Sequence, residues 1–387
     1  MPATIRDRSP RPGDDELSAL GSRRSTFEWI WRQAARFEEG LTIRHVAAVE
    51  GLVAEDGSIP RIRGVRVAGV GIVNADLVVD ACGRRSRVPD WLEAVGARRP
   101  AFEFGECALI YNTRHYQLRP GHVAPERQPG QGAVIATILP YAVALLFPSD
   151  NDTVQLSIGS LAEDRPMKAA RHAAAFDAFA RCIPALGPWL EVLEPISGVW
   201  SMSAPRNVLR HDVVDGTPVA VGLLAAGDAV CNTNPSFGRG MSLALAQAAA
   251  LADVLAAHPT DEHARALALH ETITREIEPW YHDQVAQDDV RVATARAAVF
   301  GTPKPAPVRI GGGFTLIEVF AAAAVDATVW RAITRRAMML DGPTTMFDDT
   351  AMVERVSAAL ATGAKPPQPS VPSREDVLRA IEAAVRA

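Results

Sequence analysis

The segment Gly227–Gly240, GDAVCNTNPSFGRG, constrains the fold more than any other part of the chain. An apolar run, PVAVGLLAAG, leads into it, and a long alanine-rich run, MSLALAQAAALADVLAAH, follows it. This order predicts a buried strand that ends at Gly-Asp, a loop rich in Pro and Gly, and then a helix. Glycines at 238 and 240 allow the loop backbone to lie against a ligand, and the helix N-terminus offers N–H groups and partial positive charge. We expect a ligand site at this sheet edge; an ordinary strand–loop–helix without a ligand is the alternative.

A second segment, ADLVVDACGRRSRVPDWLEAVGA, has a similar layout. Its start is a near-continuous apolar run, which is typical of a strand covered on both faces. The run ends in small residues, and a short helix is expected after them. Arg84, Arg85 and Arg87 lie in the turn, where ligand contact and plain solvation are both open.

The two segments, preceded by the helical stretch RRSTFEWIWRQAA and by GLTIRHV, resemble the aromatic-hydroxylase (p-hydroxybenzoate hydroxylase-like) superfamily of FAD-dependent oxidoreductases. The second flavin motif of that superfamily runs Gly-Asp-Ala-x-His-x-x-x-Pro-x-x-Gly-x-Gly. The resemblance implies that Asp228 meets the ribityl chain, that Pro235 lies near the reactive ring, and that the backbone of Gly238 and Gly240 meets the pyrimidine end. The histidine of the motif is replaced here by Cys231.

The resemblance also implies that Ala81 and Gly83 let the chain pass close to the FAD pyrophosphate. Cys82 stands where the family has Thr or Asp, and small-residue packing is a better interpretation for it than a thiolate role. The complete set of predicted cofactor-binding residues is Ala81, Gly83, Ser86, Arg87, Gly227, Asp228, Pro235, Gly238, Gly240 and Met241.

One part of the family pattern is not found in the sequence. Such enzymes begin with a strand, Gly-x-Gly-x-x-Gly and a helix, which hold the ADP half of FAD. Gly69 and Gly71 lack a third glycine and a following helix, and RIGGGF at 309–314 is wrongly placed. Two explanations are open: the true start lies upstream, which we favour, or the chain is a shortened relative that binds FAD weakly or not at all. Either way, we expect exposed strand edges and exposed apolar surface.

The 387-residue length is too great for one ordinary core. The predicted fold class is α/β, with an incomplete Rossmann-like FAD domain, an inserted antiparallel-sheet substrate domain and a helical C-terminal region. The FAD domain is predicted at 1–98 and 206–258, with its first βαβ unit absent. The substrate domain is predicted at 99–205, the helical region at 259–360, and a linker with a terminal helix at 361–387.

The composition is that of a soluble globular protein, with 48% apolar and 22% charged residues. A net charge of −5 gives no reason to expect a nucleic-acid partner. The four cysteines show no metal-binding spacing, so no metal site is predicted, and a reduced cytoplasmic setting fits them best. The most apolar helical run, at 311–333, contains charged residues, so stable membrane insertion is not expected. His211, His270 and His282 show no partner pattern.

The predicted function is that of a flavin-dependent monooxygenase. By resemblance it hydroxylates or epoxidises a small hydrophobic or aromatic substrate through a flavin C4a-hydroperoxide, with FAD as cofactor and NAD(P)H as a candidate electron donor. A reductase of the geranylgeranyl type and a truncated, non-catalytic relative are the alternatives. Halogenase activity is disfavoured, because Trp29-Ile30-Trp31 lies on an early helix and no Ile-Pro follows it.

No catalytic residue can be assigned from the sequence. Tyr111, His115, Tyr116 and Tyr141 are candidates in the predicted substrate domain, although packing or surface roles weigh more for each. The expected partner is a small-molecule substrate, and the sequence specifies neither which substrate nor the oligomeric state.

Overall fold

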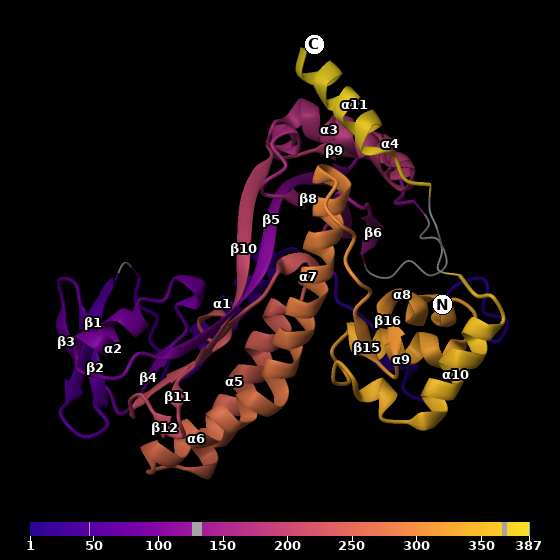
Figure 1. Cartoon of the computed structure of the whole chain (residues 1–387). Coiled ribbons are helices and arrows are strands. Elements are labelled where there is room, and N and C mark those ends of the chain that lie inside the picture. The colour runs from indigo at the N-terminus through magenta and orange to yellow at the C-terminus, as the bar shows by residue number, and fades with distance from the viewer. Residues whose placement is uncertain (46, 126–133, 366–369, 387) are drawn as a thin grey trace. The chain divides into compact units, whose positions relative to one another are not determined.

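The computed structural model describes residues 1–45, 47–125, 134–365 and 370–386. It contains both helices and sheets, as predicted for the α/β class (Figure 1). The chain divides into two compact units: unit 1 is Met1–Phe37, Ala108–Pro205 and Asp289–Ala387, and unit 2 is Glu38–Cys107 and Arg206–Asp288. The divisions fall inside β5 (Ala101–Leu118), β10 (Trp200–His211) and α7 (Glu278–Phe300), so each of these elements contributes residues to both units.

Unit 1 is built on an antiparallel sheet with the strand order β10-β5-β8-β7-β6, and β9 also pairs with β5. The strands besides β5 and β10 are β6 (Ile135–Ile138), β7 (Ala142–Pro148), β8 (Thr153–Leu161) and β9 (Leu193–Pro195). The β5–β8 ladder is continuous from Leu109↔Leu161 to Gln117↔Thr153. Nearly all of β8 is buried, which explains its apolar and small residues.

The other elements of unit 1 are mostly helices. They are α1 (Arg24–Phe37), α3 (Ala173–Arg181), α4 (Gly187–Val192), α8 (Leu316–Ala323), α9 (Ala327–Ala337), α10 (Thr350–Ala361), α11 (Arg374–Arg386) and the short strands β15 (Arg309–Gly311) and β16 (Phe314–Thr315). The apolar run at 311–333 therefore becomes two short helices, and Asp326 caps the second by accepting N–H bonds from Thr328 and Val329.

Helix α11 is the predicted terminal amphipathic helix, and it belongs to the main core of unit 1. It begins after Ser373, whose hydroxyl accepts a hydrogen bond from the N–H of Asp376 at 3.1 Å. Its apolar residues Val377 and Ile381 are buried in one cluster with Phe176 and Phe179 of α3. Figure 1 shows α11 lying against α3.

Among its described residues, unit 2 contains a three-stranded antiparallel sheet, a parallel strand pair, the helices α2 (Val88–Ala94), α5 (Gly240–Ala257) and α6 (Glu262–Thr272), and the start of α7. The strands are β1 (Val49–Glu55), β2 (Arg61–Val67), β3 (Gly71–Asn74), β4 (Val78–Asp80), β11 (Val213–Val214), β12 (Thr217–Pro218), β13 (Leu223–Ala225) and β14 (Cys231–Asn232). Strands β1 and β2 pair across the connection that contains Asp56-Gly57. Leu52, Ile62 and Leu92 form part of the core that these strands share with α2.

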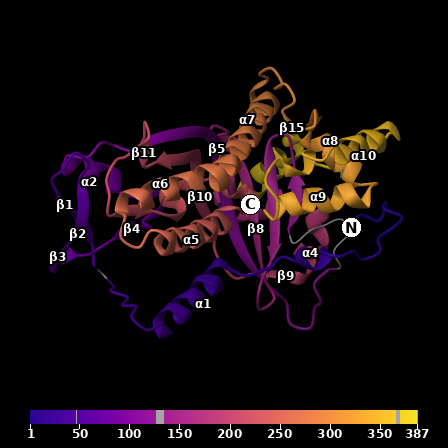
Figure 2. The same ribbon diagram turned by 90° about the horizontal axis from the view of Figure 1, so that it is seen from below.

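Helix α5 follows the Gly227–Gly240 segment, as predicted, and lies beside α6 (Figures 1 and 2). It is apolar along its length, yet its buried residues are only Leu243, Gln247 and Val254. Met241 and Leu245 are 42% and 46% exposed, and Val79 of β4 is 41% exposed. The predicted exposure of apolar surface is confirmed. Within the described residues, α5 is also the one helix whose length and hydropathy would suffice to cross a membrane.

We predict that replacing Ile381 with Ala lowers the free energy of unfolding of unit 1 by about 2–4 kcal/mol, because the truncation leaves a cavity in the core. Val385→Ala is the matched control on the same helix: Val385 is 58% exposed, so the change should stay within about 0.5 kcal/mol. Chemical denaturation followed by circular dichroism measures both. Equal effects of the two substitutions would contradict the packing of α11 on α3.

Candidate functional site

The two segments that resemble flavin motifs meet at one edge of a parallel strand pair. Strand β13 pairs with β4 in parallel, in the register Leu223↔Val78 to Ala225↔Asp80. Parallel strands end at the same edge, so the loops that follow them begin side by side. A Cβ on Gly83 would lie 3.7 Å from the Cβ of Asp228, so the loops are in contact. The fold thus brings together two segments that are far apart in the sequence.

The first loop is folded around the buried carboxylate of Asp80. One oxygen accepts a hydrogen bond from the N–H of Cys82 at 3.1 Å. The other accepts from the hydroxyl of Ser86 at 2.6 Å and from Nη1 of Arg210 at 2.7 Å. Both Asp80 and Arg210 are 2% exposed, and Nε of Arg210 also donates to Asp212 at 2.7 Å. The ion pair therefore fixes the start of the loop from inside the unit.

Four of the predicted cofactor-binding residues lie in this loop: Ala81, Gly83, Ser86 and Arg87. The hydroxyl of Ser86 is used by Asp80 and by the N–H of Val88, at 3.1 Å, so its contact with a cofactor stays a prediction. Gly83 has φ +70°, which favours glycine. Ala81 and Arg87 are exposed, and the guanidinium of Arg87 lies 5.7 Å from the ring centre of Trp91.

Cys82 is exposed in the same loop. Burial of its thiol, together with the nearby Asp80 carboxylate, raises the pKa of Cys82, so the thiol stays protonated near neutral pH. This agrees with the interpretation that Cys82 has no thiolate role.

The second loop presents Asp228 to solvent. Gly227 precedes it with φ +68°, and its N–H donates to Oε1 of Gln247 on α5 at 2.9 Å. Cys231, at the position of the family's histidine, is buried. Burial, and to a smaller extent the negative charge of Asp228, raises the pKa of its thiol to about 12.

A buried amide network holds the stretch before Pro235. The N–H of Asn234 donates to Oδ1 of Asn207 at 2.6 Å, and its Nδ2 donates to Asp288 at 2.6 Å. The other carboxylate oxygen of Asp288 accepts from Asn207 at 2.9 Å and from Gln284 at 3.1 Å. Asn234, Asn207, Gln284 and Asp288 are all buried, so Pro235 is attached to a rigid support.

The end of the second loop is bare backbone. Gly238 has φ +69°, and a Cβ there would meet no atom within 4 Å. The N-cap residue of α5, Arg239, makes no side-chain capping bond to the first turn, which begins at Gly240. The first N–H groups of a helix have no acceptor within the helix. Between the two glycines, Arg239 is 3% exposed, and its guanidinium lies 4.9 Å from the ring centre of Phe237 and 4.7 Å from that of Trp280.

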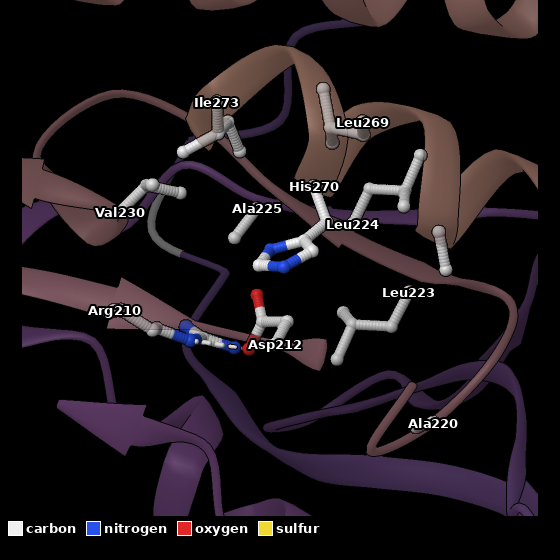
Figure 3. Close-up of a pocket in the computed structure, with 11 residues that line it drawn as sticks. Arg210, Asp212, Ala220, Leu223, Leu224, Ala225, Val230, Leu269, His270 and Ile273 are labelled. Carbon is white, nitrogen blue, oxygen red and sulfur yellow. Dashed lines mark hydrogen bonds and ion pairs between the residues drawn. The ribbon is translucent and has the colours of Figure 1, made fainter. Parts of the chain in front are cut away.

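A separate cavity of about 30 Å³ lies behind β13, between that strand and α6. Figure 3 shows Arg210, Asp212 and His270 directed into it, with Leu223, Leu269 and Ile273 around them. This volume holds about one water molecule. The cavity is therefore too small for an aromatic cofactor and is not the predicted ligand site.

The three histidines for which the sequence shows no partner pattern have contacts in the structure. Nε2 of His211 lies 2.8 Å from Glu103, and its ring lies edge-on to His270. Nε2 of His282 lies 3.2 Å from Glu278. The partners of His211 come from other elements, so no local pattern announced them. Glu278 precedes His282 by one helical turn and could have been noticed.

The four candidates in the predicted substrate domain belong to unit 1. Tyr116 and Tyr141 are buried, and their hydroxyls donate to Asp177 and to the carbonyl of Pro372. Tyr111 reaches the sulfur of Met202 at 3.7 Å. His115 is partly buried, and burial lowers its pKa. The two buried tyrosines thus have the packing roles that the sequence favoured.

Comparison with known proteins defines the fold. No protein-family model matches the chain. A curated relative, Protein Rv3254 of Mycobacterium tuberculosis (strain ATCC 25618 / H37Rv), is 29% identical over 256 residues, which cover 62% of this chain and 51% of the relative. The chain thus spans about half the length of the curated relative that it matches.

Two solved structures cover most of the chain. One is pqsL, described as a probable FAD-dependent monooxygenase from Pseudomonas aeruginosa, with a TM-score of 0.53, 18% identity and 72% of each chain covered. Another is the myxobacterial chondrochloren halogenase CndH, described as a new variant of FAD-dependent halogenases, with a TM-score of 0.50, 16% identity, and 96% of this chain and 79% of that one covered. The chain has the fold of FAD-dependent oxidoreductases of the monooxygenase and halogenase type. The predicted resemblance is thereby confirmed for the fold.

We predict that Asp80→Asn lowers the free energy of unfolding of unit 2 by on the order of 3 kcal/mol, because Arg210 keeps a buried charge without its main partner. Cys82 should also react faster with a thiol reagent, since burial and the Asp80 carboxylate together raise its pKa. Asp90→Asn is the control: Asp90 pairs with Arg99 in an exposed bridge at 3.1 Å, whose loss costs about 0.2–1 kcal/mol. Denaturation and thiol-labelling rates measure the two effects, and an unchanged Cys82 rate in Asp80→Asn would argue against this account of the loop.

Proposed function

We propose that the chain is a flavin-dependent oxidoreductase of the monooxygenase type that uses FAD. The observation that carries the proposal is the meeting of two loops at the β4–β13 edge. A Cβ on Gly83 would lie 3.7 Å from Cβ of exposed Asp228, and a Cβ on Gly240, where α5 starts, would lie 3.9 Å from Oδ1 of Asp228. A carboxylate can accept hydrogen bonds from the hydroxyls of a polyhydroxylated chain. Helix N–H groups and open backbone can donate to an electron-rich carbonyl edge.

The residues present fit the flavin half of FAD. Asp228 is exposed and available to accept hydrogen bonds from ribityl hydroxyls. Gly238 has room in front of its Cα, so a flat ring can approach the backbone there. Thr233 Oγ1 and Gln247 Nε2 are buried polar atoms without a hydrogen-bond partner within the described ranges, so polar capacity at the loop is unused. Pro235, Gly240 and Met241 complete the proposed cofactor contacts at this loop, and Ala81, Gly83, Ser86 and Arg87 would lie toward the pyrophosphate.

This sequence contains no Gly-x-Gly-x-x-Gly segment followed by a helix, the motif that would hold the ADP half of FAD. The exposed apolar side chains of α5 and β4 are where further structure could pack. The chain spans about half the length of its curated relative, and we propose only the flavin half of an FAD site for the described residues.

Bound FAD would supply the redox chemistry, with NAD(P)H as the proposed electron donor. The chain's own contribution is to orient the ring through the two loops, to stabilise negative charge on its carbonyl edge with the dipole of α5, and to exclude water. The proposed domains follow the sequence: 1–98 and 206–258 for FAD, 99–205 for the substrate, 259–360 as a helical region and 361–387 as linker and terminal helix.

The proposed substrate is a small hydrophobic or aromatic molecule that is hydroxylated or epoxidised. A reductase of the geranylgeranyl type and a non-catalytic relative remain as alternatives, and the flavin titration below separates the second from an enzyme. We propose monooxygenase rather than halogenase chemistry, because Trp29 and Trp31 lie exposed on α1 and are not followed by Ile-Pro. We also propose a soluble, cytoplasmic protein, with no nucleic acid as partner.

We predict that the chain binds FAD and quenches its fluorescence, and that Gly240→Ala weakens this binding by about tenfold or more (about 1.4 kcal/mol). The new methyl group would lie 3.9 Å from Asp228 Oδ1, an ordinary contact, and Ala favours a helix. Folding should therefore be unaffected or stabilised by up to about 1 kcal/mol while the approach of the ring is hindered. Asp228→Ala should weaken binding by roughly tenfold to a hundredfold through lost charged hydrogen bonds.

Asp253→Ala, an exposed carboxylate on the same helix, is the matched control and should leave flavin affinity unchanged. Riboflavin and FMN serve as shorter ligands, which do not need an ADP site. If the folded protein takes up none of the three flavins, the proposed function is wrong for this chain.

A further inference from the structure

A cluster of metal-ligating side chains lies in unit 2 outside the proposed flavin loops. It consists of Glu103 of β5 and of Glu278 and His282 of α7, and one ligand atom from each lies within 4.8 Å of the others. His211 of β10 adjoins the cluster through Glu103. The sequence analysis predicted no metal site because it considered cysteine spacing, which does not apply to this set.

The distances in the cluster are close to those of a metal coordination sphere. Nε2 of His282 lies 3.2 Å from Oε1 of Glu278 and 3.8 Å from Oε2 of Glu103. A zinc ion binds nitrogen and oxygen ligands at about 2.0–2.2 Å, which places neighbouring ligand atoms of a tetrahedral site about 3.3–3.6 Å apart. The two separations bracket this range, and all three ligand atoms lie within 4.8 Å of one another.

The charge of the cluster also favours a divalent cation. With neutral imidazoles, two carboxylates face each other across a few ångströms and carry two negative charges. Like charges at this spacing disfavour each other unless a cation lies between them. A mixed set of one imidazole and two carboxylates suits first-row divalent transition metals, whereas Mg²⁺ and Ca²⁺ prefer oxygen ligands alone.

His211 has the geometry of a positioning residue for Glu103. The Nε2–H of His211 donates to Oε1 of Glu103 at 2.8 Å, which leaves Oε2 on the side of His282. Carboxylates that bind metals are commonly oriented by such outer hydrogen bonds. His211 is itself held edge-on against His270, at 6.1 Å between ring centres.

The cluster is open enough for an ion to enter. The side chains of Glu103, Glu278 and His282 are 41%, 24% and 52% exposed. Three protein ligands and solvent access leave coordination positions for water. We propose that Glu103, Glu278 and His282 form a binding site for one divalent transition-metal ion of the zinc class, with His211 as a positioning residue. This site is independent of the proposed flavin function.

The test uses the full chain without a histidine tag, stripped with a chelator and titrated with Zn²⁺ by calorimetry. We expect one equivalent to bind at pH 7.5 and to bind more weakly at pH 5.5, because protons compete for the imidazole. His282→Ala and Glu278→Gln should each raise the apparent Kd by roughly tenfold or more, and His211→Ala by a smaller factor. Co²⁺ titration of the unsubstituted protein gives a visible d–d spectrum that tests the site without any substitution.

His263→Ala and Glu276→Gln are the matched controls, since both residues are exposed and lie on neighbouring helical segments outside the cluster. They should bind Zn²⁺ like the unsubstituted protein, and circular dichroism checks that every variant is folded. The proposal is overturned if no saturable binding occurs, if His282→Ala and Glu278→Gln bind as tightly as the controls, or if equimolar Mg²⁺ or Ca²⁺ displaces Zn²⁺.

Discussion

The ion pair between Arg210 and Asp80 is the constraint on which the arrangement of unit 2 depends. Both side chains are essentially inaccessible to solvent, so their desolvation is costly. It is offset by the ion pair, by the bonds that Asp80 accepts from Cys82 and Ser86, and by the bond from Arg210 to Asp212. Asp80 is the last residue of β4, and its carboxylate also binds the chain that leaves the strand. The loop beside β13 thus has one favourable conformation.

The second loop follows the same physical logic with different chemistry. Here a neutral amide, Asn234, is held by another amide and by the carboxylate of Asp288 from α7. Gln284 adds a further bond to that carboxylate from one turn earlier on the same helix. Buried polar networks of this kind specify one geometry when their members are satisfied. After this support, Gly238 ends the short turn Pro235–Phe237 with φ +69°, and a Cβ there would meet no atom within 4 Å.

Local sequence patterns predict the strands and helices of this region, but they do not reveal which side chains pair with each other after folding. The strand, loop and helix around Gly240 are encoded locally by apolar runs, glycines and an Ala-rich stretch, and their prediction is confirmed. The Arg210–Asp80 pair joins residues that meet only after folding, so no window of sequence contains both. His211 is a further example: the sequence shows no partner pattern for it, because its partner Glu103 belongs to another strand. The roles of the loop residues toward FAD stay predictions, since the fold places them without placing a ligand.

Cys231 is a residue of the second loop whose side chain does not change its charge near neutral pH. The motif that the loop resembles has an imidazole at this position, a group whose charge ordinarily changes near neutrality. The buried thiol that replaces it holds its proton up to a pKa of about 12. Between mild acid and mild alkali this position therefore contributes no variable charge. If the proposed flavin binds here, Asp228 and the dipole of α5 would supply the charge near its ring, and residue 231 would add no charge that varies with pH near neutrality.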